Sequence, residues 1–177
     1  MRKFTEGLID TRLIVNTLDL RPGQTVIDAG CGTGYMAKIF ARAVSVSGTV
    51  YAVDRDSYFI GQLADEVKGT NIEVIEGDIT NLDQISDHSA DLLYASTVIH
   101  LMQKDKIRRF VNEAKRLLKP DAMLAIVEIE KRETPFGPAM ENRCSPEELI
   151  DRIPMVPERA IKVGEHFYMQ VFLNSGK

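Results

Sequence analysis

The sequence is poor in the residues that cross-link chains or bind metals. It contains two cysteines, Cys31 and Cys144, among 177 residues, too few to indicate a disulfide framework. Its three histidines, His88, His100 and His166, are scattered and lack acids or thiols at the spacing of a metal site. We therefore expect no disulfide and no metal. The low cysteine content fits a reducing, cytoplasmic location.

An excess of positive charge and a long apolar run are also lacking. The 22 basic and 26 acidic residues give a net charge of −4, so a nucleic-acid partner is not expected. The basic residues between 104 and 119 are typical of the solvated face of an amphipathic helix. No apolar stretch approaches the roughly 20 residues of a membrane span, and the first residues lack the apolar core of a signal peptide. Membrane insertion is therefore not predicted.

Strand and helix patterns alternate along a chain whose length fits one domain, residues 1–177. The strands are expected at Thr25–Asp28, Thr49–Asp54, Asn71–Glu76, Asp91–Ala95 and Ala122–Glu130, with a hairpin over 159–174. The helices are expected at 6–18, 35–43, 57–68 and 104–118, the last ended by Pro120, and another begins at Ser145 with a capping box. This alternation predicts a doubly wound α/β domain with a mostly parallel sheet.

A glycine-rich loop follows the first predicted strand and opens a helix. It contains Gly30, Gly32 and Gly34, which allow a tight turn and remove side chains where a ligand approaches the backbone. The nicotinamide and flavin fingerprint Gly-x-Gly-x-x-Gly needs a glycine where this chain has Tyr35. The loop therefore predicts a nucleotide-like cofactor but weakens the dinucleotide interpretation.

Acidic residues follow the next two strands. Asp54 ends the second strand, twenty residues after Gly34, where an acid can accept the hydroxyl hydrogen bonds of a ribose. Gly77-Asp78-Ile79 follows the third strand, and its acid can accept from an adenine amino group. All three segments lie at the carboxyl ends of strands, where such sheets bind ligands.

These motifs together resemble those of class I methyltransferases that depend on S-adenosylmethionine (SAM), in particular the ubiquinone/menaquinone-biosynthesis, or type 11, group. Segment 91–95 and the turn 116–122 extend the resemblance over nearly the whole chain. It implies a seven-stranded Rossmann-like sheet of order 3-2-1-4-5-7-6, with strand 7 antiparallel. It also implies that the glycine loop holds the methionine part of SAM, with Asp28 near its amino group. Asp54 would then bind the ribose, and Asp78 and Ile79 the adenine.

The predicted cofactor is SAM or its demethylated product S-adenosylhomocysteine (SAH), without metal. Cys31 is interpreted as a small residue in a crowded loop rather than a nucleophile. The predicted cofactor-binding residues are Asp28, Gly30, Cys31, Gly32, Gly34, Asp54, Arg55, Asp78, Ile79 and Ser96.

His100 is the one catalytic candidate. It follows the fourth strand, where the family's substrate faces the methyl donor, and a histidine there suits a general base. The alternative is a packing histidine, which we favour because its neighbours are apolar and its segment offers no acid to orient the ring.

The predicted activity is methyl transfer to a small-molecule acceptor. Ala95-Ser96-Thr97-Val98 does not match the Asn/Asp-Pro-Pro-Tyr/Phe segment of amino-group DNA and RNA methyltransferases. A non-catalytic SAM- or SAH-binding partner subunit and an NAD(P)-dependent oxidoreductase are the alternatives. The helix within residues 1–20 and the loop 131–146 are candidate lids, and a homodimer is left open. The acceptor, and whether O, N, C or S is methylated, are not predicted.

Overall fold

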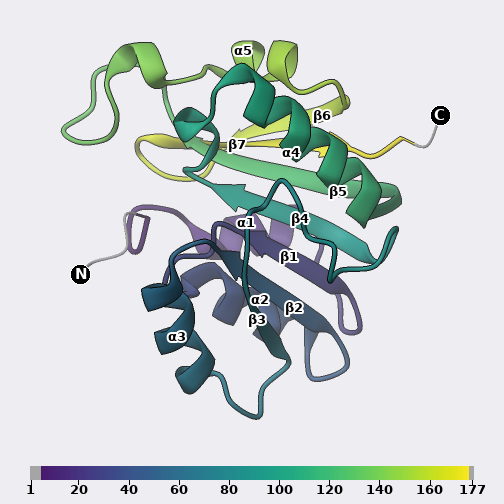
Figure 1. Cartoon of the computed structure of the whole chain (residues 1–177). Coiled ribbons are helices and arrows are strands. Elements are labelled where there is room, and N and C mark those ends of the chain that lie inside the picture. Colours follow the sequence, from purple (N-terminus) through teal and green to yellow (C-terminus); the bar gives the residue numbers. More distant parts are fainter. Residues whose placement is uncertain (1–4, 176–177) are drawn as a thin grey trace.

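A computed structural model describes residues 5–175 and contains one seven-stranded sheet of order β3-β2-β1-β4-β5-β7-β6 (Figure 1). The strands are β1 (Thr25–Ala29), β2 (Thr49–Asp54), β3 (Ile72–Glu76), β4 (Ala90–Ser96), β5 (Leu118–Ile129), β6 (Val156–Lys162) and β7 (Phe167–Leu173). Strands β1 to β5 pair in parallel, whereas β7 is antiparallel to both β5 and β6. The predicted strand order and the antiparallel seventh strand are confirmed.

Helices cover both faces of this sheet. They are α1 (Thr11–Thr17), α2 (Tyr35–Val44), α3 (Ser57–Glu66), α4 (Lys104–Leu117) and α5 (Pro146–Arg152), with short 3-10 turns η1 (Ile99–Leu101) and η2 (Met140–Asn142). One apolar core joins α1, α2 and α3 to the sheet, and a second lies under α4 and α5. In Figure 1, α4 crosses in front of the sheet and α1 lies behind it. The structure is the doubly wound architecture that the alternating pattern predicts.

The strand register aligns the carboxyl ends of four strands. Ala29 of β1 lies opposite Val53 of β2 and Ala95 of β4, and Val53 lies opposite Ile75 of β3. The residues that directly follow these positions therefore lie side by side along one edge of the sheet. This register brings together segments that are distant in sequence.

The end of α4 differs from the prediction. The helix ends at Leu117, and Leu118 already pairs with Ala90 as the first residue of β5. Pro120 lies within the bounds of β5, where the register shifts between Ala90 and Leu92. The predicted helix end at 118 is thus one residue late, and Pro120 lies beyond the helix, at a β-irregularity that can accommodate a residue without a donor for the ladder.

The segment before α1 contacts the turn between β6 and β7. The backbone N–H of Asp10 donates to the carbonyl of Val163 at 2.6 Å. A Cβ on Gly164 would lie 2.2 Å from the carbonyl oxygen of Leu8. Helix α1 itself is part of the core, since Ile14 and Leu18 are fully buried. Ile9, just before α1, is buried in the same core, and the lid stays a prediction.

The loop between β5 and α5 is held by a buried arginine. The Arg143 guanidinium donates to the backbone carbonyls of Pro138, Glu130, Arg132 and Phe136 at 2.6–3.2 Å. The capping box predicted at Ser145 is confirmed and starts α5. Within the described part of the chain, no helix is long and apolar enough to cross a membrane.

Candidate cofactor and acceptor site

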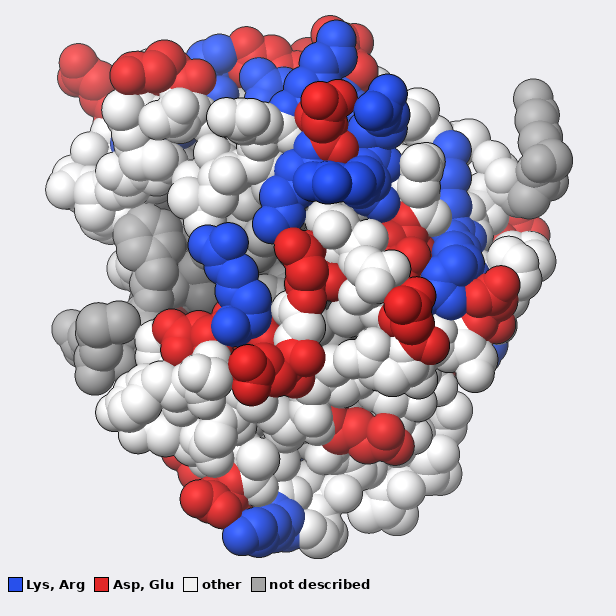
Figure 2. All heavy atoms as spheres, viewed as in Figure 1, with Lys and Arg blue, Asp and Glu red and all other residues white. Residues whose placement is uncertain are grey.

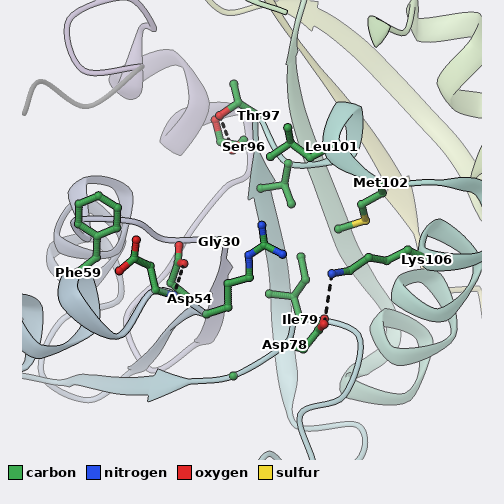
Figure 3. A pocket seen from close by; sticks show the side chains of 14 residues that line it. Gly30, Asp54, Phe59, Asp78, Ile79, Ser96, Thr97, Leu101, Met102 and Lys106 are labelled. Carbon is green, nitrogen blue, oxygen red and sulfur yellow. Dashed lines mark hydrogen bonds and ion pairs between the residues drawn. The ribbon is translucent and has the colours of Figure 1, made fainter.

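A cavity of about 310 Å³ opens at the aligned carboxyl ends of β1 to β4 (Figure 3). Asp54 and Phe59 lie on one side of it, and Asp78, Met102 and Lys106 lie on the other. Its size falls within the range of small-molecule pockets. The lining residues are Gly30, Asp54, Arg55, Asp56, Phe59, Gly77, Asp78, Ile79, Ser96, Thr97, Val98, Leu101, Met102 and Lys106.

The glycine loop is anchored to the neighbouring strand through its backbone. The N–H groups of Gly30 and Cys31 both donate to the carbonyl of Val53, at 2.8 and 2.9 Å. Gly30, Gly32 and Gly34 all have positive φ, at 80°, 51° and 73°, a region that favours glycine. The loop is therefore a tight turn, as predicted.

The three glycines differ in what a side chain would meet. A Cβ on Gly30 would lie 2.7 Å from Val98 Cγ2, and a Cβ on Gly34 would lie 2.4 Å from Leu63 Cδ1. A Cβ on Gly32 would meet no atom within 4 Å. Gly30 and Gly34 are thus required by packing within the chain, whereas protein packing alone does not require a glycine at position 32.

Asp54 organises the loops on either side of it. Its Oδ2 accepts the N–H of Gly32 at 2.8 Å, and its Oδ1 accepts the N–H of Asp56 at 3.0 Å. Each carboxylate oxygen has further lone pairs, so the group can also accept ligand hydroxyls. Asp54 therefore joins the glycine loop to the cavity wall.

The end of β3 supplies a second acid and an apolar surface. Asp78 Oδ1 accepts the N–H of Thr80 at 3.0 Å, and its Oδ2 lies 3.2 Å from Lys106 Nζ. Ile79 is buried and lines the cavity beside them. Although partial burial opposes the shift, the bonds from Thr80 and Lys106 lower the pKa of Asp78. The carboxylate is therefore ionised at neutral pH.

The chain after β4 lines the cavity in an unusual conformation. Thr97 has φ 56°, which is rare for a β-branched residue, and its N–H donates to Val127 of β5 at 2.8 Å. Strained backbone of this kind is concentrated at functional sites. The apolar cavity wall formed by Val98, Leu101 and Met102 was not predicted, because these residues match ordinary core packing in the sequence.

His100 meets an acid that its own segment lacks. Its Nδ1 lies 2.8 Å from Oε2 of Glu128, near the end of β5. Oε1 of the same carboxylate accepts the backbone N–H of Ile99 at 2.7 Å and that of His100 at 3.3 Å. The segment around His100 offers no acid to orient the ring, as expected from the sequence, but the fold supplies Glu128 from β5. Glu128 gives no sequence signal as a site residue, since it lies in an apolar strand 28 positions away.

Not every predicted cofactor residue lines the cavity. Gly30, Asp54, Arg55, Asp78, Ile79 and Ser96 line it, whereas Asp28, Cys31, Gly32 and Gly34 do not. Asp28 is buried in β1, and the other three residues follow Gly30 in the glycine loop. His100 does not line the cavity either, although Leu101 beside it does.

Cys31 is placed as a packing residue. It is 8% exposed, and its Sγ lies 3.7 Å from the carbonyl oxygen of Gly32. Burial, assisted by the negative charges of Asp28 and Asp54, strongly raises the pKa of the Cys31 thiol. The thiolate, which is the nucleophilic form, is therefore disfavoured at neutral pH.

We expect both cysteines to resist thiol reagents in the native protein. Cys144 is also buried, and burial raises its pKa. Native protein at pH 7–8 should react slowly with iodoacetamide, and protein in denaturant should release both thiols to rapid reaction. Peptide mass mapping measures each site. Rapid native labelling of Cys31 would contradict the placement of its side chain.

The fold is a doubly wound α/β domain with the class I methyltransferase strand order and a cavity at the carboxyl ends of its strands. Residues 26–121 match the family model described as "Methyltransferase domain", which covers more than half of the chain. The chain belongs to this family and is a class I SAM-dependent methyltransferase domain.

Curated relatives agree with this assignment. The chain is 33% identical over 130 residues to phosphoethanolamine N-methyltransferase 3 of Arabidopsis thaliana, covering 70% of this chain and 25% of that protein. It is 30% identical over 130 residues to the ubiquinone/menaquinone biosynthesis C-methyltransferase UbiE of Hahella chejuensis, covering 71% and 51%. The chain thus spans between a quarter and about half of the length of these two proteins.

A solved structure matches over nearly the whole chain. It is that of a SAM-dependent methyltransferase from Aquifex aeolicus, with a TM-score of 0.86, 24% identity, and coverage of 97% of this chain and 93% of that one. This likeness supports the fold. Among residues 5–175, no group of three or more His, Cys, Asp or Glu side chains is arranged to hold a metal ion.

Proposed function

We propose that this protein transfers a methyl group from SAM to a small-molecule acceptor. The observation that carries the proposal is the row at the carboxyl edge of the sheet: a glycine loop, Asp54 and Asp78 on three adjacent strands around one cavity. Bound SAM supplies a methyl group already activated on a sulfonium. The protein's task is then to align donor and acceptor and exclude water.

The residues present fit SAM. The open space at Gly32 leaves room for a ligand against the loop backbone, and Asp54 can accept ribose hydroxyls. Ile79 offers an apolar surface for a flat base, with Asp78 placed to accept from an amino group. Asp28, Cys31, Gly34, Arg55 and Ser96 complete the proposed set, the first three by shaping the loop.

A small acceptor is supported by the scale and the charge of the site. Figure 2 shows Lys and Arg gathered over α4, interleaved with acids. Lys106 is paired with Asp78 at 3.2 Å, and Arg108 with Asp105 at 3.4 Å. These pairs reduce the field that a nucleic acid would need. The names of the two relatives mention phosphoethanolamine and ubiquinone, both small molecules.

We further propose that residues 1–177 act as one domain in the cytoplasm, with the segment before α1 covering the acceptor. The contact of Leu8 and Asp10 with the β6–β7 turn supports this position, because that turn lies at the carboxyl end of β5, where Ile129 pairs with Phe167. Two buried, unpaired thiols fit a reducing compartment.

SAM and SAH are expected to stabilise the protein against heat, and NAD is not. At a hundred times Kd a ligand adds about 2.7 kcal/mol, which corresponds to roughly 5–10 °C in Tm for a chain of this size. EDTA should leave the shift unchanged. Differential scanning fluorimetry measures it. A shift with NAD but with neither SAM nor SAH would identify an oxidoreductase instead.

Catalysis is tested separately, with tritiated SAM and a panel of hydroxyl, amine, thiol and carbon acceptors. Transfer of label to any of them above the rate without protein supports the proposal. SAM binding with no transfer to the whole panel would indicate a non-catalytic SAM-binding subunit.

A further inference from the structure

The buried carboxylate of Glu128 accepts hydrogen bonds from the short segment Ile99–His100. Glu128 is 2% exposed and lies on the face of β5 that packs under α4 and α5. Three donors converge on it: the backbone N–H groups of Ile99 and His100 and the imidazole Nδ1 of His100. A carboxyl group that accepts three hydrogen bonds is well satisfied. The pair therefore fixes the position of turn η1 and the plane of the ring.

This hydrogen bond selects the tautomer of His100. A carboxylate only accepts hydrogen bonds, so Nδ1 is the nitrogen that carries the proton, and a neutral ring has its lone pair on Nε2. No described residue bonds Nε2, and this atom is not among the buried polar atoms without a partner. Nε2 is thus open to the space beyond the ring. The side chain is 11% exposed, which leaves a small accessible part.

The position of the pair matches the acceptor end of the cavity. Asp78 at the end of β3 lies at one end of the cavity, and Ser96 and Thr97 at the end of β4 lie at the other. The N–H of Thr97 donates to the carbonyl of Val127 in the neighbouring strand β5. Glu128 directly follows Val127 and therefore lies beside the end of β4. If adenine binds near Asp78, as proposed above, the rest of the cofactor would extend toward the end of β4, where Leu101, the neighbour of His100, lines the cavity.

We propose that His100 is the general base of the reaction, that Glu128 is its positioning residue, and that the acceptor is a proton-bearing O–H or N–H group. This inference rests on the proposed function. The electron pair of the acceptor atom forms the new bond to the methyl carbon, while the carbon–sulfur pair stays on the sulfur of SAH. The acceptor's proton moves to Nε2 and then to solvent. An acceptor without such a proton needs no base.

The first test reads the tautomer directly and needs no acceptor. Long-range ¹⁵N–¹H spectra of the labelled protein, assigned with a His100→Gln variant, report which ring nitrogen carries the proton. We expect Nδ1–H in the wild type. Glu128→Gln preserves shape and an oxygen for the Ile99 and His100 N–H groups, but its amide donates to Nδ1 and moves the ring proton to Nε2. An Nε2–H ring in the wild type, or an unchanged tautomer in Glu128→Gln, overturns the proposal.

The second test compares acceptors with and without a proton to lose. The probes are phenol, n-butylamine and iodide, methylated from tritiated SAM. His100→Gln and Glu128→Gln should lower phenol or butylamine methylation about 10²–10⁴-fold and leave both iodide methylation and SAM affinity unchanged. His88→Gln is the matched control, because the His88 Nδ1 bonds the carbonyl of Leu118, far from this site in the fold. It should leave all rates unchanged.

The outcomes separate this proposal from the proposed function. If Glu128→Gln lowered the methylation rates of iodide and of the proton-bearing probes equally, Glu128 would have a purely structural role. Methylation of iodide alone by the wild type would refute the acceptor class. SAM binding without methylation of any probe would reject the proposed function itself, and this proposal with it.

The pH profile provides a further check. The wild-type rate on phenol should show a limb that rises with pH, because only neutral imidazole accepts a proton, and His100→Gln should lack this limb. Glu128, the partner of His100, acts electrostatically on Cys144 and Tyr168, and Glu147, Glu148, Arg152 and Lys131 act on the same two groups. Burial raises the pKa of Cys144 and of Tyr168, whereas hydrogen bonds lower the pKa of Glu147 and of Glu148, so these four keep their charge state around pH 7. An unchanged limb in His100→Gln would contradict the assignment.

Discussion

Gly32→Val is expected to abolish SAM binding in a protein that still folds. In the free chain a Cβ at position 32 meets no atom within 4 Å, so protein packing tolerates the new side chain. The branched side chain would instead occupy the space that the loop leaves for a ligand. A clash that costs about 3 kcal/mol or more lowers affinity by at least roughly 100-fold. Isothermal titration calorimetry with SAM and SAH measures the loss.

Gly69→Val is the matched control for this experiment. Gly69 has φ 77° against 51° for Gly32, and its Cβ also meets no atom within 4 Å, but it lies after α3 and away from the cavity. In both variants the strained backbone should lower the free energy of unfolding by about 1–2 kcal/mol. Only Gly32→Val should lose SAM. Equal SAM affinity in the two folded variants would show that the loop at Gly32 does not contact the cofactor.

Asp54→Ala is expected to weaken SAM and SAH binding by about 1.5–3 kcal/mol, or roughly 10- to 150-fold. The carboxylate is positioned by the N–H groups of Gly32 and Asp56, so its removal costs ligand hydrogen bonds and loosens the glycine loop. Asp54→Asn should cost less, because one acceptor oxygen remains. Calorimetric titration of the three proteins gives the order of affinity.

Asp65→Ala controls for the loss of one negative charge. Asp65 is exposed on α3 and pairs with Lys68 at 2.8 Å, outside the cavity. We expect its SAM affinity to match the wild type. If Asp54→Ala behaved in the same way, Asp54 would have no part in the proposed ribose site.

The meeting of the proposed cofactor residues Gly30, Asp54 and Asp78 at one cavity could be predicted because their signals are local. A glycine triplet after a strand, and acids at the ends of the next two strands, are each readable over a few residues. The parallel sheet then places every strand's carboxyl end at one edge, so the motifs meet without further information. The direction of the strands and their alternation with helices were therefore enough to predict that Gly30, Asp54 and Asp78 line one cavity.

The acceptor half could not be predicted in the same way. Val98, Leu101 and Met102 have the composition of core residues, and only their placement after β4 exposes them to the cavity. Thr97 takes a left-handed conformation that its residue type disfavours. Lys106 belongs to a helix with an ordinary solvated face, yet it reaches Asp78. Each of these depends on contacts between distant segments.

The sequence by itself determined the alternation of strands and helices, the glycine turn and the acids that mark the cofactor end, because local periodicity and backbone chirality act over short stretches. Only the tertiary structure decided that His100 has an acid partner. Glu128 lies 28 residues further on, within a strand that is otherwise apolar. The parallel pairing of β4 with β5 sets its carboxylate beneath turn η1. Because register between strands is a property of the assembled sheet, no local pattern around His100 could show this pair.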